Sequence, residues 1–150
     1  MRTRLTLTPS PGKSPSDHPF FLKLSSPMGI KFFLLVAAGG SCGSVLRALV
    51  GILMKSFLPW PTLVVNLGGA FLIGLLVKFS ENSANEESFR AFWIIGLCGG
   101  FTTFSTFGMD MVNFIKTGHW TGGLIYMSLN FFGTLLAIYL GFRAFSLISS

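Results

Sequence analysis

The stretch Gly96–Phe107, which reads GLCGGFTTFSTF, constrains the fold more than any other part of the chain. It lies in the middle of an apolar segment long enough to cross a membrane. Its glycines weaken a helix, and Ser and Thr hydroxyls follow them directly. Backbone freed from helical hydrogen bonds cannot face lipid, and it persists at membrane depth only when protein buries it or it lines a wet cavity. We therefore expect this segment to face inward, enclosed by the other helices.

The composition is that of an integral membrane protein. The chain has 150 residues, of which 51% are hydrophobic and only 11% are charged, and soluble domains carry about twice that charge. The basic residues behind the net charge of +6 are scattered singly at the ends of apolar runs, which argues against nucleic-acid binding. Cys42 and Cys98 stand in apolar segments without CxxC spacing. We interpret both as small buried thiols, neither a disulfide nor a metal site.

The apolar segments predict an all-α membrane protein with four transmembrane helices, the third broken in mid-membrane. The polar stretch Lys78–Arg90 is interpreted as an exposed loop. Residues 1–28 are rich in proline and isolated basic residues, so we expect a disordered basic tail, with Met28 as a second candidate start. The predicted membrane domain is 29–150, with spans over residues 30–54, 60–78, 89–115 and 121–147.

Four helices with several glycine pairs are too thin to enclose a polar path alone. We therefore expect a homo-oligomer, most simply a two-fold dimer, with an interface built on the close contacts that glycine allows. The flanking basic residues, counted together with the tail, place both ends of the chain in the cytoplasm. Without the tail, both orientations are open.

Asn66 lies midway along the second predicted span, one turn after Thr62, so both side chains share one helix face. An amide in hydrocarbon needs hydrogen-bond partners, and its NH2 group can donate two hydrogen bonds to an anion. The alternative is a hydrogen bond to a neighbouring helix, which such residues make in many membrane proteins.

Phe104 and Phe107 stand three residues apart, so their rings share a helix face. A phenyl ring has a positive edge, which can accept a small anion in a narrow path without offering a full charge. Plain packing is the alternative, but a packing helix has no need of the hydroxyl residues that surround this pair.

Four other positions have two interpretations each. The backbone of Gly99–Thr102 either presents free carbonyl oxygens to a cation or simply kinks the helix. Arg47 either draws anions towards a vestibule or extends to the membrane surface. Asp110 is either functional at membrane depth or within reach of the surface. Tyr126 is a hydroxyl donor that supports the Phe pair or another polar contact.

These residues resemble the Fluc (CrcB) family of small fluoride channels, over roughly Met28 to the C-terminus. Gly39–Arg47 (GGSCGSVLR) is similar to its GGxxGxxxR pattern, and Thr62–Gly74 (TLVVNLGGAFLIG) to its TLxVNxxGxFxxG pattern. The run GGFTTFSTF at Gly99–Phe107 is the most specific mark of the family. Three motifs in the right order argue against chance agreement.

The resemblance implies an antiparallel, dual-topology homodimer in the cell (inner) membrane, with two fluoride pores and one central Na+ ion at the interface. By position, Gly99 and Thr102 would supply the sodium carbonyls, and Arg47 would lie at the vestibule. The fluoride pore would be lined by Asn66 as the amide, Phe104 and Phe107 as the ring box, and Thr62, Ser105, Thr106, Asp110 and Tyr126.

The sequence departs from the family pattern in places. Ala48 replaces a tyrosine, and Asn130 falls where the family tends to have a small hydroxyl residue, so we expect part of the polar path to be altered. The long basic tail leaves room for a subunit of fixed orientation that pairs with an oppositely inserted paralogue.

The implied function is passive export of cytoplasmic fluoride, without ATP or coupled protons, and no enzymatic activity. One alternative is a small dual-topology exporter of cationic drugs, which needs a membrane carboxylate early in the chain, whereas Asp110 lies late. An intramembrane enzyme is disfavoured because no Ser/His/Asp set appears: His18 is in the tail and His119 in a surface turn. A structural subunit without transport would leave the polar break unexplained.

Overall fold

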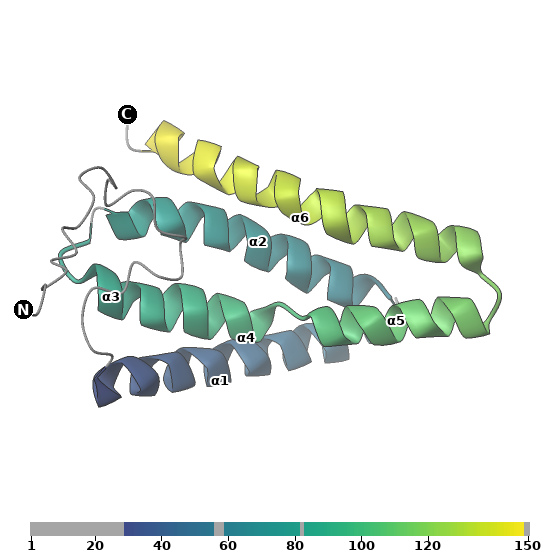
Figure 1. Ribbon diagram of the computed structural model, residues 1–150, viewed down its shortest axis with the longest axis horizontal. Helices are drawn as coiled ribbons and strands as arrows, with labels where there is room; N and C mark the ends of the chain where they lie inside the picture. The colour runs from purple at the N-terminus through teal and green to yellow at the C-terminus, as the bar shows by residue number, and fades with distance from the viewer. Residues whose placement is uncertain (1–28, 56–58, 82, 149–150) are drawn as a thin grey trace, which may run out of the picture.

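The computed structural model describes residues 29–55, 59–81 and 83–148, all helical apart from short connections. Residues 1–28, and with them the predicted tail, lie outside the described part. Four helical segments are long and apolar enough to cross a membrane. The elements along the chain are α1 (Ile30–Leu53), α2 (Trp60–Glu81), α3 (Glu86–Phe89), the π-helical η4 (Arg90–Cys98), α4 (Gly99–Phe101), α5 (Phe104–Lys116) and α6 (Trp120–Ile148) (Figure 1).

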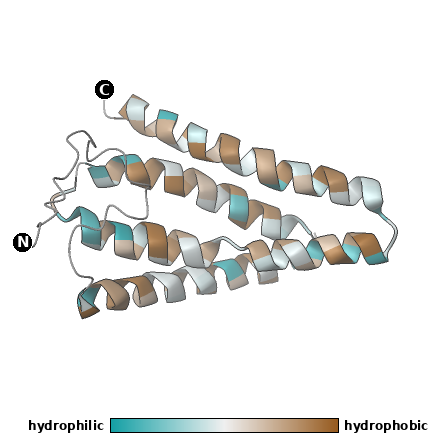
Figure 2. Cartoon of the chain, viewed as in Figure 1, coloured by the Kyte–Doolittle hydropathy of each residue, from teal (hydrophilic) through white to brown (hydrophobic). Residues whose placement is uncertain are grey.

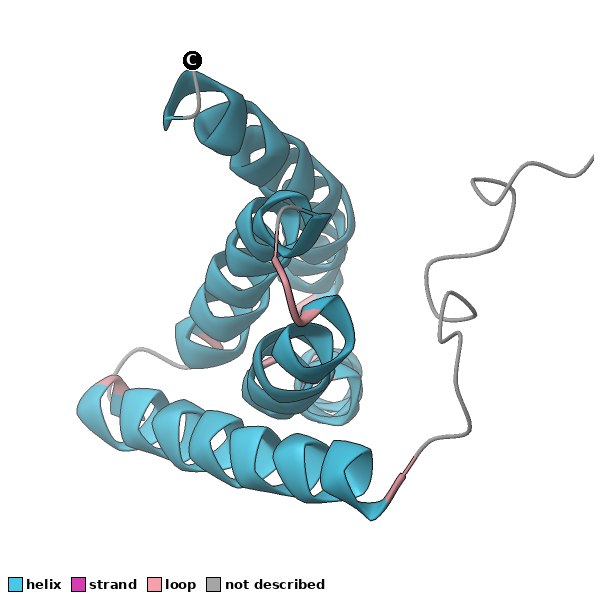
Figure 3. Ribbon diagram, turned by 90° about the vertical axis from the view of Figure 1, so that its left-hand side faces the viewer, coloured by secondary structure: helices cyan, strands magenta, loops and turns pink. Residues whose placement is uncertain are grey.

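The four spans alternate in direction, so α1 begins and α6 ends at the same end of the bundle (Figure 1). The third span is formed by α3, η4, α4 and α5. Its η4 and α4 pack on α1 and its η4 also packs on α2, whereas α6 packs mainly on α2. In the end-on view, α1 crosses the other helices obliquely (Figure 3). The third span thus contacts both α1 and α2, and this position brings its break next to both helices.

Glycine sets how closely these helices approach. A Cβ on Gly43 would overlap the carbonyl oxygen of Leu97, and a Cβ on Gly74 would overlap that of Ile138. Backbone therefore packs on backbone at the crossing of α1 with the third span and at that of α2 with α6.

The break in the third span does not fall at its glycines. Gly99 and Gly100 are helical, and a Cβ on Gly100 would lie 2.5 Å from the Gly40 carbonyl oxygen, so the absence of a side chain there serves packing. The helix ends one step later, where Thr102 (φ −77°, ψ 159°) and Thr103 (φ −153°, ψ 127°) are extended. The expectation of a glycine break was wrong in position, although the span is broken in mid-membrane. The sequence also gave no sign of η4.

The polar stretch Lys78–Arg90 is mostly helical, which corrects its interpretation as a loop. Lys78 Nζ pairs with Glu81 Oε2 at 3.1 Å, one turn apart in α2, and Arg90 Nη1 pairs with Glu86 Oε1 at 3.1 Å across the start of the third span. Pairs at these spacings support a helix in polar surroundings. Ser80 is fully buried and donates to the Val77 carbonyl oxygen at 2.7 Å.

Large apolar side chains remain exposed along all four spans. Hydrophobic residues also predominate along the four spans (Figure 2). A helix that is apolar over most of its surface meets lipid rather than water. Cys98 is buried as expected, but Cys42 is exposed, because it lies on a face of α1 that is turned away from the third span. A small apolar thiol on a lipid-facing surface needs no burial in protein.

Candidate functional site

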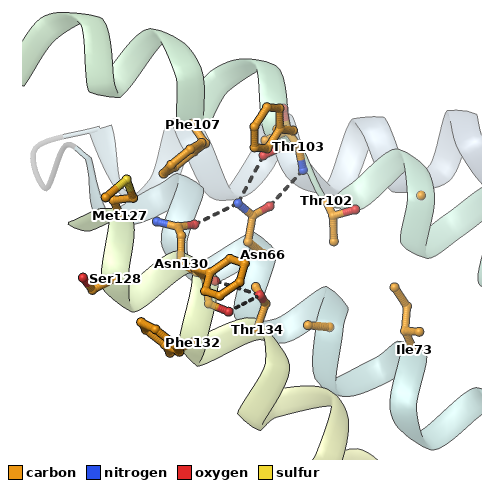
Figure 4. Close-up of a pocket in the computed structure, with 14 residues that line it drawn as sticks. Asn66, Ile73, Thr102, Thr103, Phe107, Met127, Ser128, Asn130, Phe132 and Thr134 are labelled. Atoms are coloured by element: carbon orange, nitrogen blue, oxygen red, sulfur yellow. Dashed lines mark hydrogen bonds between the residues drawn. The ribbon is translucent and has the colours of Figure 1, made fainter. Parts of the chain in front are cut away.

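The site is organised by a reciprocal contact between Asn66 of α2 and Thr103 at the break (Figure 4). The Thr103 N–H donates to Asn66 Oδ1 at 2.9 Å, and Asn66 Nδ2 donates to the Thr103 carbonyl oxygen at 3.1 Å. Buried backbone polar groups that leave a helix must find other partners. The Asn66 amide provides the acceptor that the Thr103 N–H has lost, and it adds a donor to the Thr103 carbonyl, which as the N-cap carbonyl also starts α5.

The second hydrogen of the Asn66 NH2 group goes to α6. Asn66 Nδ2 donates to Asn130 Oδ1 at 3.0 Å, and Asn130 Nδ2 donates to the Tyr126 carbonyl oxygen at 3.1 Å. Asn66 therefore makes the hydrogen bonds between helices that were one of its two interpretations. Donation from Asn66 to an anion stays a prediction.

The break also redirects the donors of two backbone carbonyls. In an unbroken helix the Thr103 N–H would donate to the Gly99 carbonyl, but it donates to Asn66 instead. The Thr106 N–H would donate to the Thr102 carbonyl, but it donates to Thr103 Oγ1 at 3.2 Å, as in a helix N-cap. Arg47 Nη1 donates to the Thr102 carbonyl at 3.1 Å. The Arg47 side chain thus contacts the break.

Hydroxyl groups gather in the first turn of α5. The buried Thr103 Oγ1 lies 3.2 Å from both Ser105 Oγ and Thr106 Oγ1, and the Ser105 and Thr106 residues are exposed. Hydroxyls can turn their hydrogens outward, and the N-terminus of a helix carries partial positive charge. This turn therefore favours a negative charge placed beside it.

An aromatic stack continues from the same turn. The Phe104 and Phe107 ring centroids are 5.4 Å apart, and Phe107 stacks on Tyr126 at 5.6 Å. Phe107 is half-buried, whereas Phe104 is 83% exposed in the single chain. The two rings share a face, as their spacing predicted, and nothing in the single chain covers the outer ring.

Asp110 and Tyr126 join α5 to α6. Tyr126 Oη donates to Asp110 Oδ2 at 2.7 Å, and Tyr126 is buried. Thr62 is also buried, one turn before Asn66 on α2. The structure thus brings most of the predicted site residues to the region between α2, α5 and α6, whereas Arg47 reaches the break from α1.

A groove of about 840 Å³ opens beside the break (Figure 4). Of the predicted site residues, its lining includes Asn66, Gly99, Thr102, Phe104 and Phe107. The others contribute nothing to the lining, which is completed by Thr103, by Ala70 and Ile73 of α2, and by Met127, Ser128, Asn130, Phe131, Phe132 and Thr134 of α6.

The predicted site residues did not include four polar members of this lining, Thr103, Ser128, Asn130 and Thr134, although Asn130 was named as a departure on the polar path. For Asn130 and Thr134 a sequence signal was available, because Tyr126, Asn130 and Thr134 recur every four residues and so share a face of α6.

Fold and site together define a small helical membrane protein in which a polar break is held inside the third of four spans. Residues 34–142 match the family model described as CrcB-like protein, Camphor Resistance (CrcB). The chain belongs to this family, as the motif resemblance indicated.

Curated relatives of similar length support the assignment. The chain is 42% identical over 113 residues to the "Fluoride-specific ion channel FluC" of Rhizobium meliloti, covering 72% of this chain and 90% of the relative. It is 39% identical over 119 residues to the protein of that name in Marinobacter nauticus, covering 77% and 94%. With "Fluoride-specific ion channel FluC 1" of Nitrobacter hamburgensis the identity is 46% over 101 residues, covering 64% and 80%.

Proposed function

We propose that this protein is a fluoride-selective channel that exports cytoplasmic fluoride passively across the cell (inner) membrane and so lowers its toxicity. Family membership and the names of the relatives support the activity. The observation that carries the proposal is the break at Thr102 and Thr103, which exposes hydroxyl groups and a helix N-terminus at membrane depth. External acid carries HF into the cell, where it dissociates, so flow of the anion down its gradient suffices.

Fluoride is small and strongly hydrated, so a path across the membrane must replace its water with other donors along the whole route. The Ser105 and Thr106 hydroxyls and the Asn66 amide would supply hydrogen bonds, and the edges of Phe104 and Phe107 would supply partial positive charge. Thr62, Tyr126 and Asp110 would support this path. Arg47, which carries a full charge next to the break, would raise the local concentration of anions at the vestibule.

The partner in the membrane would be a second copy of the chain, inserted with opposite orientation. Extended backbone and hydroxyl groups cannot face lipid, yet in the single chain Ser105 and Thr106 are exposed and Phe104 is 83% exposed. A two-fold dimer would cover this side and give two equivalent pores. An oppositely inserted paralogue could fill the same place.

A sodium ion at the dimer interface would be held by the backbone carbonyls of Gly99 and Thr102. The break redirects the helical donors of both oxygens, and the Thr102 oxygen has a second lone pair beside the one that accepts from Arg47. Carbonyl oxygen is a ligand that hard cations prefer, so the two oxygens fit such an ion. In the described part of the chain no group of three His, Cys, Asp or Glu residues forms an alternative metal site. When bound, the ion would supply positive charge that holds the two broken spans together.

The test is efflux of fluoride from liposomes that contain the purified protein, followed with a fluoride electrode. Fluoride should leave rapidly, while chloride, loaded in parallel, should be retained. If the wild-type protein releases no fluoride, or releases chloride at a similar rate, the proposed function is wrong.

A further inference from the structure

We propose that Asn130 is a positioning residue that sets how readily Asn66 gives its amide hydrogen to a passing anion. The inference rests on the proposed function and adds a control point on α6. Asn130 is 7% exposed, and its Oδ1 accepts one of the two hydrogens of the Asn66 NH2 group, at 3.0 Å. Both residues line the groove beside the break (Figure 4).

The orientation of the Asn130 amide is fixed from both sides. Its Nδ2 donates to the Tyr126 carbonyl oxygen, one turn earlier in α6, at 3.1 Å, so its Oδ1 is the atom that faces Asn66. Turning the amide over would place two NH2 groups against each other and would set Oδ1 against the Tyr126 carbonyl oxygen. Asn130 therefore acts towards Asn66 only as an acceptor.

The three hydrogen bonds of Asn66 are not equivalent. One of them satisfies the Thr103 N–H, which has lost its helical acceptor, and a second goes to the Thr103 carbonyl, which as the N-cap carbonyl also starts α5. The third goes to a side-chain oxygen on another helix. A fluoride ion in the groove would take the hydrogen from Asn130 Oδ1, exchanging one acceptor for another while the break stays intact. How strongly Asn130 accepts then determines how easily this exchange occurs.

Two substitutions change this acceptor in opposite directions. In Asn130→Ser the shorter side chain withdraws the acceptor and leaves a hydroxyl that can donate. In Asn130→Asp the carboxylate is a stronger acceptor for the Asn66 N–H and also repels an anion. A residue that only filled space would respond to both changes with a loss.

The experiment measures fluoride efflux from liposomes for the full-length wild type and both variants. We expect Asn130→Ser to reach half-maximal flux at a roughly 3- to 10-fold lower fluoride concentration, which corresponds to the net loss of one neutral hydrogen bond. Asn130→Asp should lower the flux by at least about tenfold. Asn113→Ser and Asn113→Asp, which make the same exchanges at an exposed position of α5, should match the wild type.

A second readout follows the hydrogen itself. In wild-type protein labelled with 15N, the side-chain amide signals of Asn66 and Asn130 should move together as sodium fluoride is titrated, with sodium held constant. In Asn130→Ser the Asn66 signal should move at lower fluoride. This titration tests the proposal in the wild type even if a variant fails to fold.

The outcomes separate the two proposals. If the wild type releases no fluoride, the proposed function fails. If the wild type conducts but both variants change flux in the same direction or leave it unchanged, Asn130 has no positioning role and the channel assignment stands. Fluoride-independent signals of Asn66 and Asn130 in a conducting wild type would also overturn the positioning role.

Discussion

The side chain of Asn66 bonds both backbone polar groups of Thr103, as a neighbouring strand would in a sheet. The pair lies midway along two spans that are long and apolar enough to cross a membrane, where lipid cannot replace either hydrogen bond. A single residue of the second span therefore contacts both backbone polar groups at the polar break of the third.

Substitutions of Asn66 should affect both the stability of the protein and its fluoride flux, and the two effects can be measured independently. Asn66→Leu leaves the Thr103 N–H without its acceptor and removes one of the donors to the Thr103 carbonyl, so we expect a loss of about 1–3 kcal/mol, chiefly for the unsatisfied N–H. Asn66→Asp keeps an acceptor for the Thr103 N–H but sets a carboxylate oxygen against the oxygens of Thr103 and Asn130, so it should be at least as destabilising, and without the amide donors it should fail to pass fluoride. Thermal unfolding in detergent and liposome efflux measure the two effects. Asn113→Asp is the matched control, and normal flux through Asn66→Asp would contradict the pore role.

Phe104 should be needed for transport and not for the fold of the single chain. Its ring is 83% exposed, so Phe104→Ile should leave the thermal midpoint of the monomer within experimental error. Because the branched side chain has no positive ring edge, fluoride efflux should fall by at least about tenfold. Phe33→Ile, at a 53% exposed position of α1, should change neither quantity. Equal efflux from both variants would remove Phe104 from the pore.

The glycine contact between α1 and the third span predicts a stability difference between two alanine variants. Gly43→Ala would push a methyl group into the Leu97 carbonyl and should cost about 1–3 kcal/mol of unfolding free energy. Gly51→Ala, on the same helix with nothing within 4 Å of the new Cβ, should be neutral or slightly stabilising. Unfolding in mixed detergent measures both. Equal stabilities would show that these backbones are not in contact.

The hydroxyl of Tyr126 should contribute to stability through Asp110. Tyr126→Phe removes the 2.7 Å hydrogen bond but keeps the ring stacked on Phe107, so a loss of about 1–3 kcal/mol is expected. Tyr139→Phe, at a 57% exposed position of α6, is the control and should be neutral. Asp110→Asn removes the charge but retains an oxygen that can accept the hydrogen bond from Tyr126. If it lowers the unfolding free energy as much as Tyr126→Phe does, the stabilisation depends on the negative charge of Asp110.

Removing sodium is the direct test of the carbonyl site, since no side-chain substitution removes a backbone oxygen. Replacing Na+ by N-methylglucamine should lower the unfolding free energy of the assembled protein, by about 2.7 kcal/mol if sodium was present at a hundred times its Kd. The midpoint should return as Na+ is restored. A midpoint that is the same in both cations would argue against sodium at Gly99 and Thr102.

Sequence reasoning located the four spans because the thickness of a bilayer requires a run of about 20 apolar residues for each helix that crosses it. Such a run can be read from the sequence without knowledge of tertiary contacts. The same reasoning misplaced the break, because glycine has a low helix propensity in isolation. In the structure Gly100 is helical and packs closely on the backbone of Gly40. Thr103 ends the helix through its N-cap to Thr106 and through Asn66, which lies 37 residues away. The N-cap is a local signal that can be read from sequence, but the contact with Asn66 is not.

The candidate residues were easier to choose than to connect. Asn66 stood out because an amide is rare in an apolar span, yet its partner Asn130 lies 64 residues further along the chain. The four-residue polar period on α6 pointed to one face of that helix, but nothing local told which helix that face meets. Likewise, Arg47 was recognised by its motif, while its bond to Thr102 depends on the way α1 crosses the third span.

The π-helical segment η4 changes the direction in which the side chains that follow it point around the axis of the third span. Each of its turns holds more residues than an α-helical turn, because its hydrogen bonds reach five residues along the chain. Every side chain beyond Cys98 is therefore rotated about the helix axis relative to a regular helix. Rewinding η4 into a regular α-helix with the same number of residues would rotate Thr103 about the helix axis away from Asn66 without altering either of them, so the orientation of the polar groups is set by upstream residues that do not line the groove.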